Sequence, residues 1–365
     1  LGGNLQILYF GNWKSPQFEL NDLGYLQIAD RYTGSFIFNY NIYKPKGIFL
    51  HNTYSGNFAH VFDFGGTLQQ LAESVLWSAC YKNLWESEIN IQTSGTRVSN
   101  SLLRSGPSIK LPGYLYLSAV AETDKRKKMS VEADVIYKSG YQNRSEESRI
   151  ISLEINYRPS PSFFFNVEPS ADIEHNELQY VTKVNNNNDP AQPRYIMATL
   201  DEKILSFSLR AEYNITPDLS VQYWGQPFIC TGRYTDFKNA QNTLSDNYGE
   251  RFHTFSPRIS GVSAGEIYYN PEYRAYMIYE GGASDSNLSY YFSKPDFSFS
   301  EFLSNLVVKW EFRPGSVAYF VWSQSREYTT PDPAFDAAGL LSDLFSREKA
   351  CNVFLIKFSY RFGLH

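Results

Sequence analysis

Alternation of apolar and polar side chains is the feature of this chain that most restricts its fold. From Leu205 to Asn214, every second residue is apolar, and the residues between them are serine, arginine, glutamate or asparagine. Successive side chains of a β-strand point to opposite faces, so this pattern predicts a strand with one apolar and one polar face. The alternation resumes from Leu219 to Trp224 after a short turn at 215–218, which predicts an antiparallel hairpin.

The same alternation recurs along nearly the whole chain. It is clearest in six further segments, residues 85–92, 129–138, 151–157, 163–168, 302–313 and 354–362. A soluble sandwich would fit two or three of these segments. The complete set fits a barrel in lipid better, because the strands are long, aromatic residues cluster at the ends of the apolar faces, and short connections alternate with long ones. The sequence therefore predicts an all-β fold, a transmembrane antiparallel β-barrel with a polar lumen and long extracellular loops.

The connections set the expected number of strands. Short connections are expected at 44–47, 80–83, 123–127, 159–161, 215–217 and 313–316, and long ones at 11–32, 61–67, 94–107, 140–147, 184–193, 236–299 and 328–348. They predict about fourteen strands in one domain, residues 1–365, with the segment 236–299 as a long loop or a plug. Helical spacing at 335–345 predicts one short helix in the last long connection.

Composition excludes several alternatives. Aromatic residues make up 17% of the chain, the mean hydropathy is −0.39, and no apolar stretch approaches the ~20 residues of a membrane-spanning helix. The net charge of −5 argues against a nucleic-acid partner. Cys80, Cys230 and Cys351 lie far apart and the five histidines lack metal-ligand spacing, so we expect no disulfide framework, no metal site and no cofactor.

The last predicted strand carries an expected targeting signal. Phe358, Tyr360 and Phe362 alternate on one face near the C-terminus, which predicts the recognition signal for barrel insertion. We therefore expect an outer-membrane location, outer-membrane lipid as a partner, and both termini in the periplasm. Export requires a signal peptide and this chain starts at Leu1, so the sequence is interpreted as a mature or trimmed form.

The polar faces of the predicted strands are rich in charged residues. Those expected to face the lumen are Glu86, Glu88, Glu132, Asp134, Glu154, Glu168, Arg210, Glu212, Lys309 and Arg313. Two interpretations remain open, namely the polar lining of a pore and a set of ion pairs that fills a narrow barrel. The sequence does not decide between them, because the width of a lumen depends on the complete number of strands.

A membrane-embedded hydrolase is a further possibility, but its motifs are weak. Residues 261–265, Gly-Val-Ser-Ala-Gly, match the nucleophile-elbow pattern, but the residues that follow favour a strand where that motif requires a helix. His60 with Asp63 and His175 with Glu174 are the local histidine–carboxylate candidates. We expect no catalytic residue.

Three longer stretches carry a family resemblance. They read PDFSFSEFLSNLVVKWEFRPGSVAYFVWSQSR at 295–326, FELNDLGYLQIAD at 18–30 and PDLSVQYWGQPFICTGRYTDFK at 217–238. With them, the chain resembles an uncharacterised outer-membrane β-barrel family of Bacteroidota over nearly its whole length. In that family a signal peptide and a carbohydrate-binding module, similar to family nine of such modules, usually precede the barrel. The resemblance implies that these strands are the C-terminal part of a larger barrel, and it implies no catalytic residue.

The expected function is transport rather than catalysis. The first hypothesis is a passive or partner-gated channel for small polar solutes, with the long segment from Asp236 as a constriction or lid. The alternative is a structural or assembly component of a multiprotein outer-membrane complex, in which the wall and the long loops dock other outer-membrane or periplasmic proteins. A membrane-embedded hydrolase is the least favoured of the three.

Overall fold

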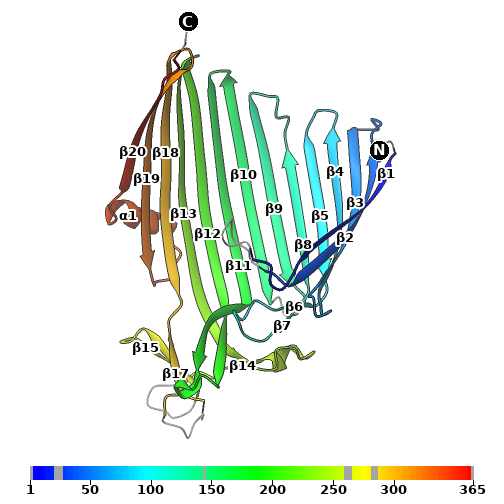
Figure 1. The fold of residues 1–365 in the computed structure, drawn as a ribbon, viewed down its shortest axis with the longest axis vertical. Coiled ribbons are helices and arrows are strands. Elements are labelled where there is room, and N and C mark those ends of the chain that lie inside the picture. The colour runs from blue at the N-terminus through cyan, green and yellow to red at the C-terminus, as the bar shows by residue number, and fades with distance from the viewer. Residues whose placement is uncertain (1–2, 20–27, 143–144, 259–264, 281–286, 363–365) are drawn as a thin grey trace.

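The chain forms one long antiparallel sheet. The computed structural model describes residues 3–19, 28–142, 145–258, 265–280 and 287–362. Across these residues, fourteen strands follow one another in chain order, and each is hydrogen-bonded to its neighbours (Figure 1). They are β1 (Leu5–Lys14), β2 (Arg31–Ile42), β3 (Phe49–Phe62), β4 (Leu68–Tyr81), β5 (Glu86–Ser94), β8 (Tyr114–Glu122), β9 (Met129–Gly140), β10 (Glu146–Ser160), β11 (Phe163–Asn185), β12 (Pro193–Thr216), β13 (Leu219–Ala240), β18 (Phe297–Arg313), β19 (Ser316–Thr330) and β20 (Cys351–Ser359).

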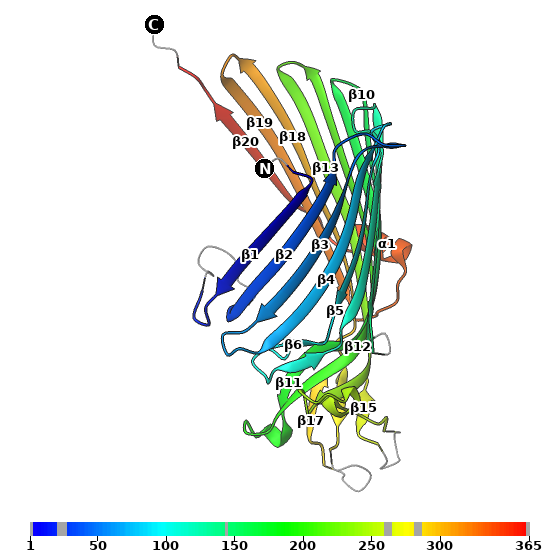
Figure 2. The ribbon, with the colours of Figure 1, turned by 90° about the vertical axis from the view of Figure 1, so that its right-hand side faces the viewer.

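The sheet curves into a trough and does not close. Figure 2 shows β1 and β20 as its two rims, and in the described part of the chain no strand pairing joins them. The predicted all-β class, antiparallel pairing and number of about fourteen strands are confirmed. The closed barrel is absent from the described residues. Alternation decides only which face each residue takes, whereas closure also requires two edge strands to meet at a consistent tilt and stagger.

The two ends of the sheet differ in their connections. The short-turn end carries the connections 43–48, 82–85, 123–128, 161–162, 217–218 and 314–315, which coincide within a few residues with the predicted short ones. Leu5 pairs with Tyr40 and Ser359 pairs with Val317, so both outer strands begin or finish at this same end. The opposite end, called the long-loop end, carries the longer connections.

Cross-strand register gives the sheet two different faces. Phe207 lies opposite Pro169 on one face, and Ser206 lies opposite Ser170 on the other. Ile229 on β13 lies on the same face as Phe207, because it is opposite Leu205 on β12. Ser300 on β18, which is opposite Ile229, lies on this face as well. One face of the sheet is therefore apolar over much of its height, and the other is polar.

Helix α1 (Ala337–Ser346) shows which face is convex. It begins after Asp336, whose carboxylate accepts a hydrogen bond from the backbone N–H of Gly339 at 3.0 Å. The ring of Phe345 lies 5.2 Å from that of Phe302, which is on the apolar face two residues from Ser300. Figure 2 shows α1 on the convex side, so the apolar face is convex and the polar face is concave. The predicted helix is confirmed, with a shift of two residues at its start.

Among the described helices, none is long and apolar enough to cross a membrane.

Part of the segment between β13 and β18 folds as a second small sheet beyond the long-loop end (Figure 1). It contains β15 (Ile267–Asn270), β16 (Ala275–Ile278) and β17 (Tyr290–Ser293), while the short helix η2 (Tyr248–Arg251) and β14 (Phe252–Thr254) lie beside β13. We call η2 and β14–β17 the distal subdomain. Its core also includes side chains from β12 and β13; the members are Ile196, Ala198, Phe237, Phe255, Ile278, Tyr290 and Phe292.

The connection between β5 and β8 is tied to the distal subdomain. It contains the hairpin of β6 (Arg97–Ser99) and β7 (Ile109–Leu111). Arg251, which is 1% exposed, donates hydrogen bonds to the carbonyl oxygens of Lys110, Ser245 and Asp246. One buried guanidinium therefore joins two long connections that are distant in sequence.

Candidate functional site

The concave face collects all the charged residues that the sequence assigns to a lumen. The register of successive strands places each of them on the same face of the sheet as Ser206 and Ser208. They are Glu86, Glu88, Glu132, Asp134, Glu154, Glu168, Arg210, Glu212, Lys309 and Arg313. Within the described residues, none of the ten forms an ion pair with another of the ten.

A row of carboxylates crosses four neighbouring strands near the short-turn end. Glu86 lies directly opposite Glu122, Glu122 lies opposite Glu132, and Glu132 lies opposite Glu154. Like charges that lie directly opposite each other destabilise a sheet, so this row needs counter-charges or water. Sequence reasoning missed Glu122, because β8 is too uniformly apolar and small in composition for its alternation to be visible.

Two members of this row have partners within the described residues. Lys125 Nζ lies 2.7 Å from Glu122 Oε1, and the side-chain amides of Asn156 and Asn166 donate to Glu154 Oε1 at 3.1 and 2.8 Å. In the adjacent turn, hydrogen bonds from Arg126 lower the pKa of Asp124 to about 2. Turn residues therefore hold part of the carboxylate row at this end of the trough.

The cationic residues of the predicted lining are spread over the C-terminal half of the sheet. Arg210 lies opposite Trp224, and Lys309 lies opposite Tyr319. Arg313 Nη1 donates to the hydroxyl oxygen of Tyr360 at 2.7 Å. Arg210 and Lys309 thus have aromatic cross-strand neighbours, and Arg313 contacts an aromatic side chain directly.

A second charged group lies on the concave face toward the long-loop end. Arg97 Nη2 lies 3.1 Å from Glu146 Oε2, and Lys138 forms an ion pair with the same carboxylate. Both cations stand 4.9 Å from the ring centroid of Tyr114. Sequence reasoning missed this group because Arg97 reaches the sheet from a loop, and nothing local in the sequence records that contact.

The residues of the predicted insertion signal lie at the exposed end of the chain's last strand. Phe358 is on the convex face of β20, opposite Ala318, and is 73% exposed. Tyr360 and Phe362 follow the end of β20, and their rings lie 4.8 Å apart. The alternation of these aromatic residues is as predicted, and their role in insertion stays a prediction.

The candidate catalytic motifs do not come together in the described residues. Residues 261–264 of the predicted elbow lie outside the described part of the chain, so its serine has no structural account. The ring of His60 lies among aromatic rings, including Phe58 and Phe62, and His175 pairs with Asp201 at 2.7 Å rather than with Glu174. The described residues also contain no cluster of three histidine, cysteine or carboxylate side chains arranged to hold a metal ion.

Comparison with known protein families identifies the family of this chain. A family model described as a domain of unknown function, DUF5916, matches residues 1–362. The chain belongs to the DUF5916 family. Searches of the curated proteins and of the solved structures found no significant match. The predicted membership of an uncharacterised family is therefore confirmed, and because the DUF5916 description states no activity, a functional assignment has to be argued from the geometry of the sheet.

Proposed function

We propose that this DUF5916 chain forms the wall of a bacterial outer-membrane β-barrel that acts as a passive or partner-gated channel for small polar solutes. The observation that carries the proposal is the pair of faces on one continuous sheet. A convex apolar face suits lipid, and a concave face with exposed charge suits water. As the resemblance implies, we place the protein in the outer membrane of Bacteroidota, in a barrel that follows a carbohydrate-binding module.

The height of the apolar face supports a membrane span. On β12 the convex positions from Leu205 to Tyr213 are apolar or aromatic, and the next convex residues beyond Leu205 are Lys203 and Asp201. Such a stretch of nine residues matches the ~9 to 11 that a tilted strand needs to cross a bilayer. At its other end, the rings of Tyr213 and Phe163 lie 6.2 Å apart, as in the aromatic girdle of a membrane barrel.

The open rims require a partner strand in this proposal. An unpaired strand edge in hydrocarbon leaves backbone N–H and C=O groups without hydrogen bonds, which costs several kcal/mol for each group. We therefore propose that β1 and β20 are paired in the membrane, within a barrel larger than the fourteen strands described here. The absence of ion pairs among the ten predicted lining residues favours an open polar lining over a filled lumen.

Orientation follows from the two ends of the sheet. We propose that the short-turn end, with both termini, faces the periplasm and that the long-loop end faces the outside. An epitope inserted at Asn186 or Pro333 should then be reached by antibody on intact cells, whereas one at Thr216 should not. The reverse accessibility would overturn this orientation.

The direct test is conductance in planar lipid bilayers. In a background with Cys80, Cys230 and Cys351 replaced by serine, the channel should conduct in steps, and a negatively charged thiol reagent should reduce the current of the Ser206→Cys variant. The matched Leu205→Cys variant, one residue away on the convex face, should be unaffected. No conductance from the folded protein with its barrel closed would refute the channel.

One observation favours the assembly component as a second candidate. Strand β20 exposes apolar residues on both faces, with Val353 and Leu355 on the concave side and Phe354 on the convex side. An apolar strand edge of this kind fits a neighbouring protein as well as lipid. Purification as a stable, conducting monomer in mild detergent would count against this second candidate.

A further inference from the structure

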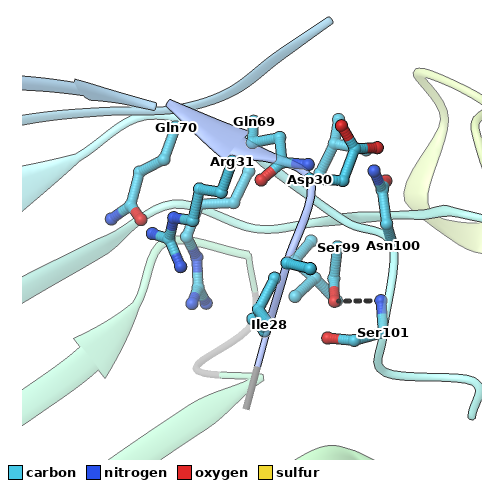
Figure 3. A pocket seen from close by; sticks show the side chains of 12 residues that line it. Ile28, Asp30, Arg31, Gln69, Gln70, Ser99, Asn100 and Ser101 are labelled. Atoms are coloured by element: carbon cyan, nitrogen blue, oxygen red, sulfur yellow. Dashed lines mark hydrogen bonds between the residues drawn. The ribbon is translucent and has the colours of Figure 1, made fainter. Parts of the chain in front are cut away.

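A pocket of 480 Å³ opens on the concave side at the long-loop end, where β2, β4 and β6 meet (Figure 3). Amide and hydroxyl groups supply much of its lining, through Gln69, Gln70, Ser99, Asn100 and Ser101. Two guanidinium groups, those of Arg31 and Arg97, complete the polar part, and Ile28, Val98 and Leu111 form an apolar wall. A volume of this size accommodates a small organic molecule.

Arg31 contributes a positive charge that the described residues do not neutralise. Its Nε atom is buried and has no hydrogen-bond partner. Lys14 lies directly opposite Arg31 on β1, and among the described residues no ion pair includes either cation. Like charges directly opposite each other destabilise a sheet, so an anion beside Arg31 would relieve this repulsion.

Gln69 contributes an amide that has no hydrogen-bond partner among the described residues and stays open to the pocket. It is 8% exposed, and within the described residues its side chain has no hydrogen bond. An amide has both a donor and an acceptor, and a hydroxyl group of a ligand can pair with either of them. Gln69 and Arg31 thus each present an unfilled hydrogen-bonding position to one pocket.

The neighbouring groups are held in place by the protein. Arg97 Nε donates to the carbonyl oxygen of Pro112 at 3.2 Å while its Nη2 binds Glu146, so its position is set before any ligand arrives. Gln70 Nε2 donates to Ser94 Oγ at 3.2 Å, which leaves the amide oxygen of Gln70 free to accept. A pocket whose side chains are positioned in advance binds with a smaller entropy cost.

Asp30 is the one carboxylate in the lining, and it is turned away from this charge. Its Oδ1 accepts the backbone N–H of Phe64 at 2.9 Å. Figure 3 shows the carboxylate of Asp30 on the opposite side from the guanidinium of Arg31, which lies on the side of Gln70. The Arg31 side of the pocket therefore keeps its positive character.

We propose that this pocket binds a small hydroxylated oxyanion, with the carboxylate or phosphate group on Arg31 and hydroxyl groups on Gln69 and Gln70. A guanidinium matches such oxyanions with two parallel hydrogen bonds, which is the reason that Arg31 fixes the charged end. The site goes beyond the proposed channel, since binding requires only the folded sheet and its loops and does not require conduction.

The experiment measures binding by isothermal titration calorimetry to the full chain folded in detergent. The three probes are glucuronate, glucose 6-phosphate and glucose, which are similar in size and differ in charge. We expect one or both anions to bind at least about tenfold more tightly than glucose, as the loss of a charge-assisted hydrogen bond implies. Binding of glucuronate alone would specify a carboxylate, and binding of glucose 6-phosphate alone would specify a phosphate.

Variants connect the binding to Arg31. The Arg31→Gln variant should bind each anion that the unmodified protein binds about tenfold more weakly, whereas Arg31→Lys should lose less because it keeps the charge. The matched control is Arg149→Gln, which removes an exposed arginine paired with Glu147 on the convex face and should change nothing. A difference in gel mobility between the heated and the unheated protein verifies that each variant is folded.

Two results would overturn the proposal. One is equal binding of glucose and the two anions, or binding of none of the three. The other is unchanged anion binding in folded Arg31→Gln. Conductance of the unmodified protein is scored separately, so that anion binding without conduction would refute the channel alone, and conduction without anion binding would refute this site alone.

Discussion

The main sheet and the distal subdomain are stabilised by different surroundings. In the sheet, large apolar residues of the convex face are exposed; for example, Val75 has 62% of its surface exposed. In the distal subdomain, Ile278 is 0% exposed and packs among aromatic side chains. In the described part of the chain, most of the sheet is a single layer and helix α1 covers only part of its convex face, whereas the distal subdomain buries its apolar residues in protein.

This difference teaches where each region obtains its hydrophobic stabilisation. Burial of apolar surface contributes roughly 25 cal/mol per Å², but only when something covers that surface. Protein covers it in the distal subdomain. In the sheet, the proposed membrane location assigns this role to lipid, so we expect the sheet to depend on a membrane to a degree that the distal subdomain does not.

The largest expected effect comes from removal of the insertion signal. Deletion of residues 360–365 should leave the chain unassembled in the periplasm, because the sheet then lacks the aromatic end by which we expect it to be recognised. Membrane fractionation and heat-dependent gel mobility provide the measurement. The control is Tyr291→Ser on the exposed surface of the distal subdomain, which should assemble normally. Normal assembly of the truncated chain would show that residues 360–365 are not required for insertion.

Loss of a core residue should affect the distal subdomain strongly. Ile278→Ala leaves a cavity in a closed core, which costs about 2–5 kcal/mol in local unfolding free energy. Hydrogen exchange at the amide of Tyr279, which donates to Glu266 O at 2.9 Å, measures this opening. The matched Ile151→Ala change, at a residue of the convex face that is 60% exposed, should cost less if lipid closes the gap. Equal costs would mean that the two regions are not stabilised differently.

Charge placed on the convex face should test for lipid directly. Phe207→Arg should impair folding into lipid vesicles by about 2–4 kcal/mol, whereas Ser208→Arg, on the concave face, should be tolerated. Tyr213→Arg, at the short-turn end of the same strand, should cost less than Phe207→Arg because the penalty falls toward the interface. Equal penalties at positions 207 and 213, or a larger one at 208, would contradict the assignment of faces or of the membrane.

The smallest expected effect is a pH dependence confined to the distal subdomain. Burial by itself would raise the pKa of Glu280, but hydrogen bonds from Arg194, at 2.7 and 2.8 Å, and from Tyr290 hold that pKa below its usual range. A carboxyl group whose pKa is lowered by folding stabilises the fold above its unfolded pKa of about 4.3, and this contribution is lost as the pH falls through the folded pKa.

Acidification below about pH 4 should therefore lower the local unfolding free energy of the distal subdomain by at most about 1 kcal/mol, since the ion pair is partly exposed. Hydrogen exchange around Tyr290 measures the change, with Glu280→Gln as the variant that should lose this pH dependence. An acid effect of the same size in Glu280→Gln would assign it to another group.

Much of the sheet could be predicted from local sequence. The face of Glu132 or Phe207 follows from its neighbours two residues away, because side chains alternate along any strand. The turns at 217–218 and 314–315 follow from breaks in that alternation. The row of carboxylates could be predicted only in part, since Glu122 lies in a strand without visible alternation and its position opposite Glu132 depends on register.

By itself, the sequence determined the class of fold, the approximate number of strands and the two faces, because these depend on backbone geometry that acts over two or three residues. The tertiary structure decided that the described sheet stays open between β1 and β20 and that Arg251 joins two long connections. It also decided that Lys14 lies opposite Arg31 and that Arg31 and Gln69 line one pocket. Those contacts join residues that are far apart in the chain. They are selected by register, curvature and packing between whole elements, which no local pattern of side chains records.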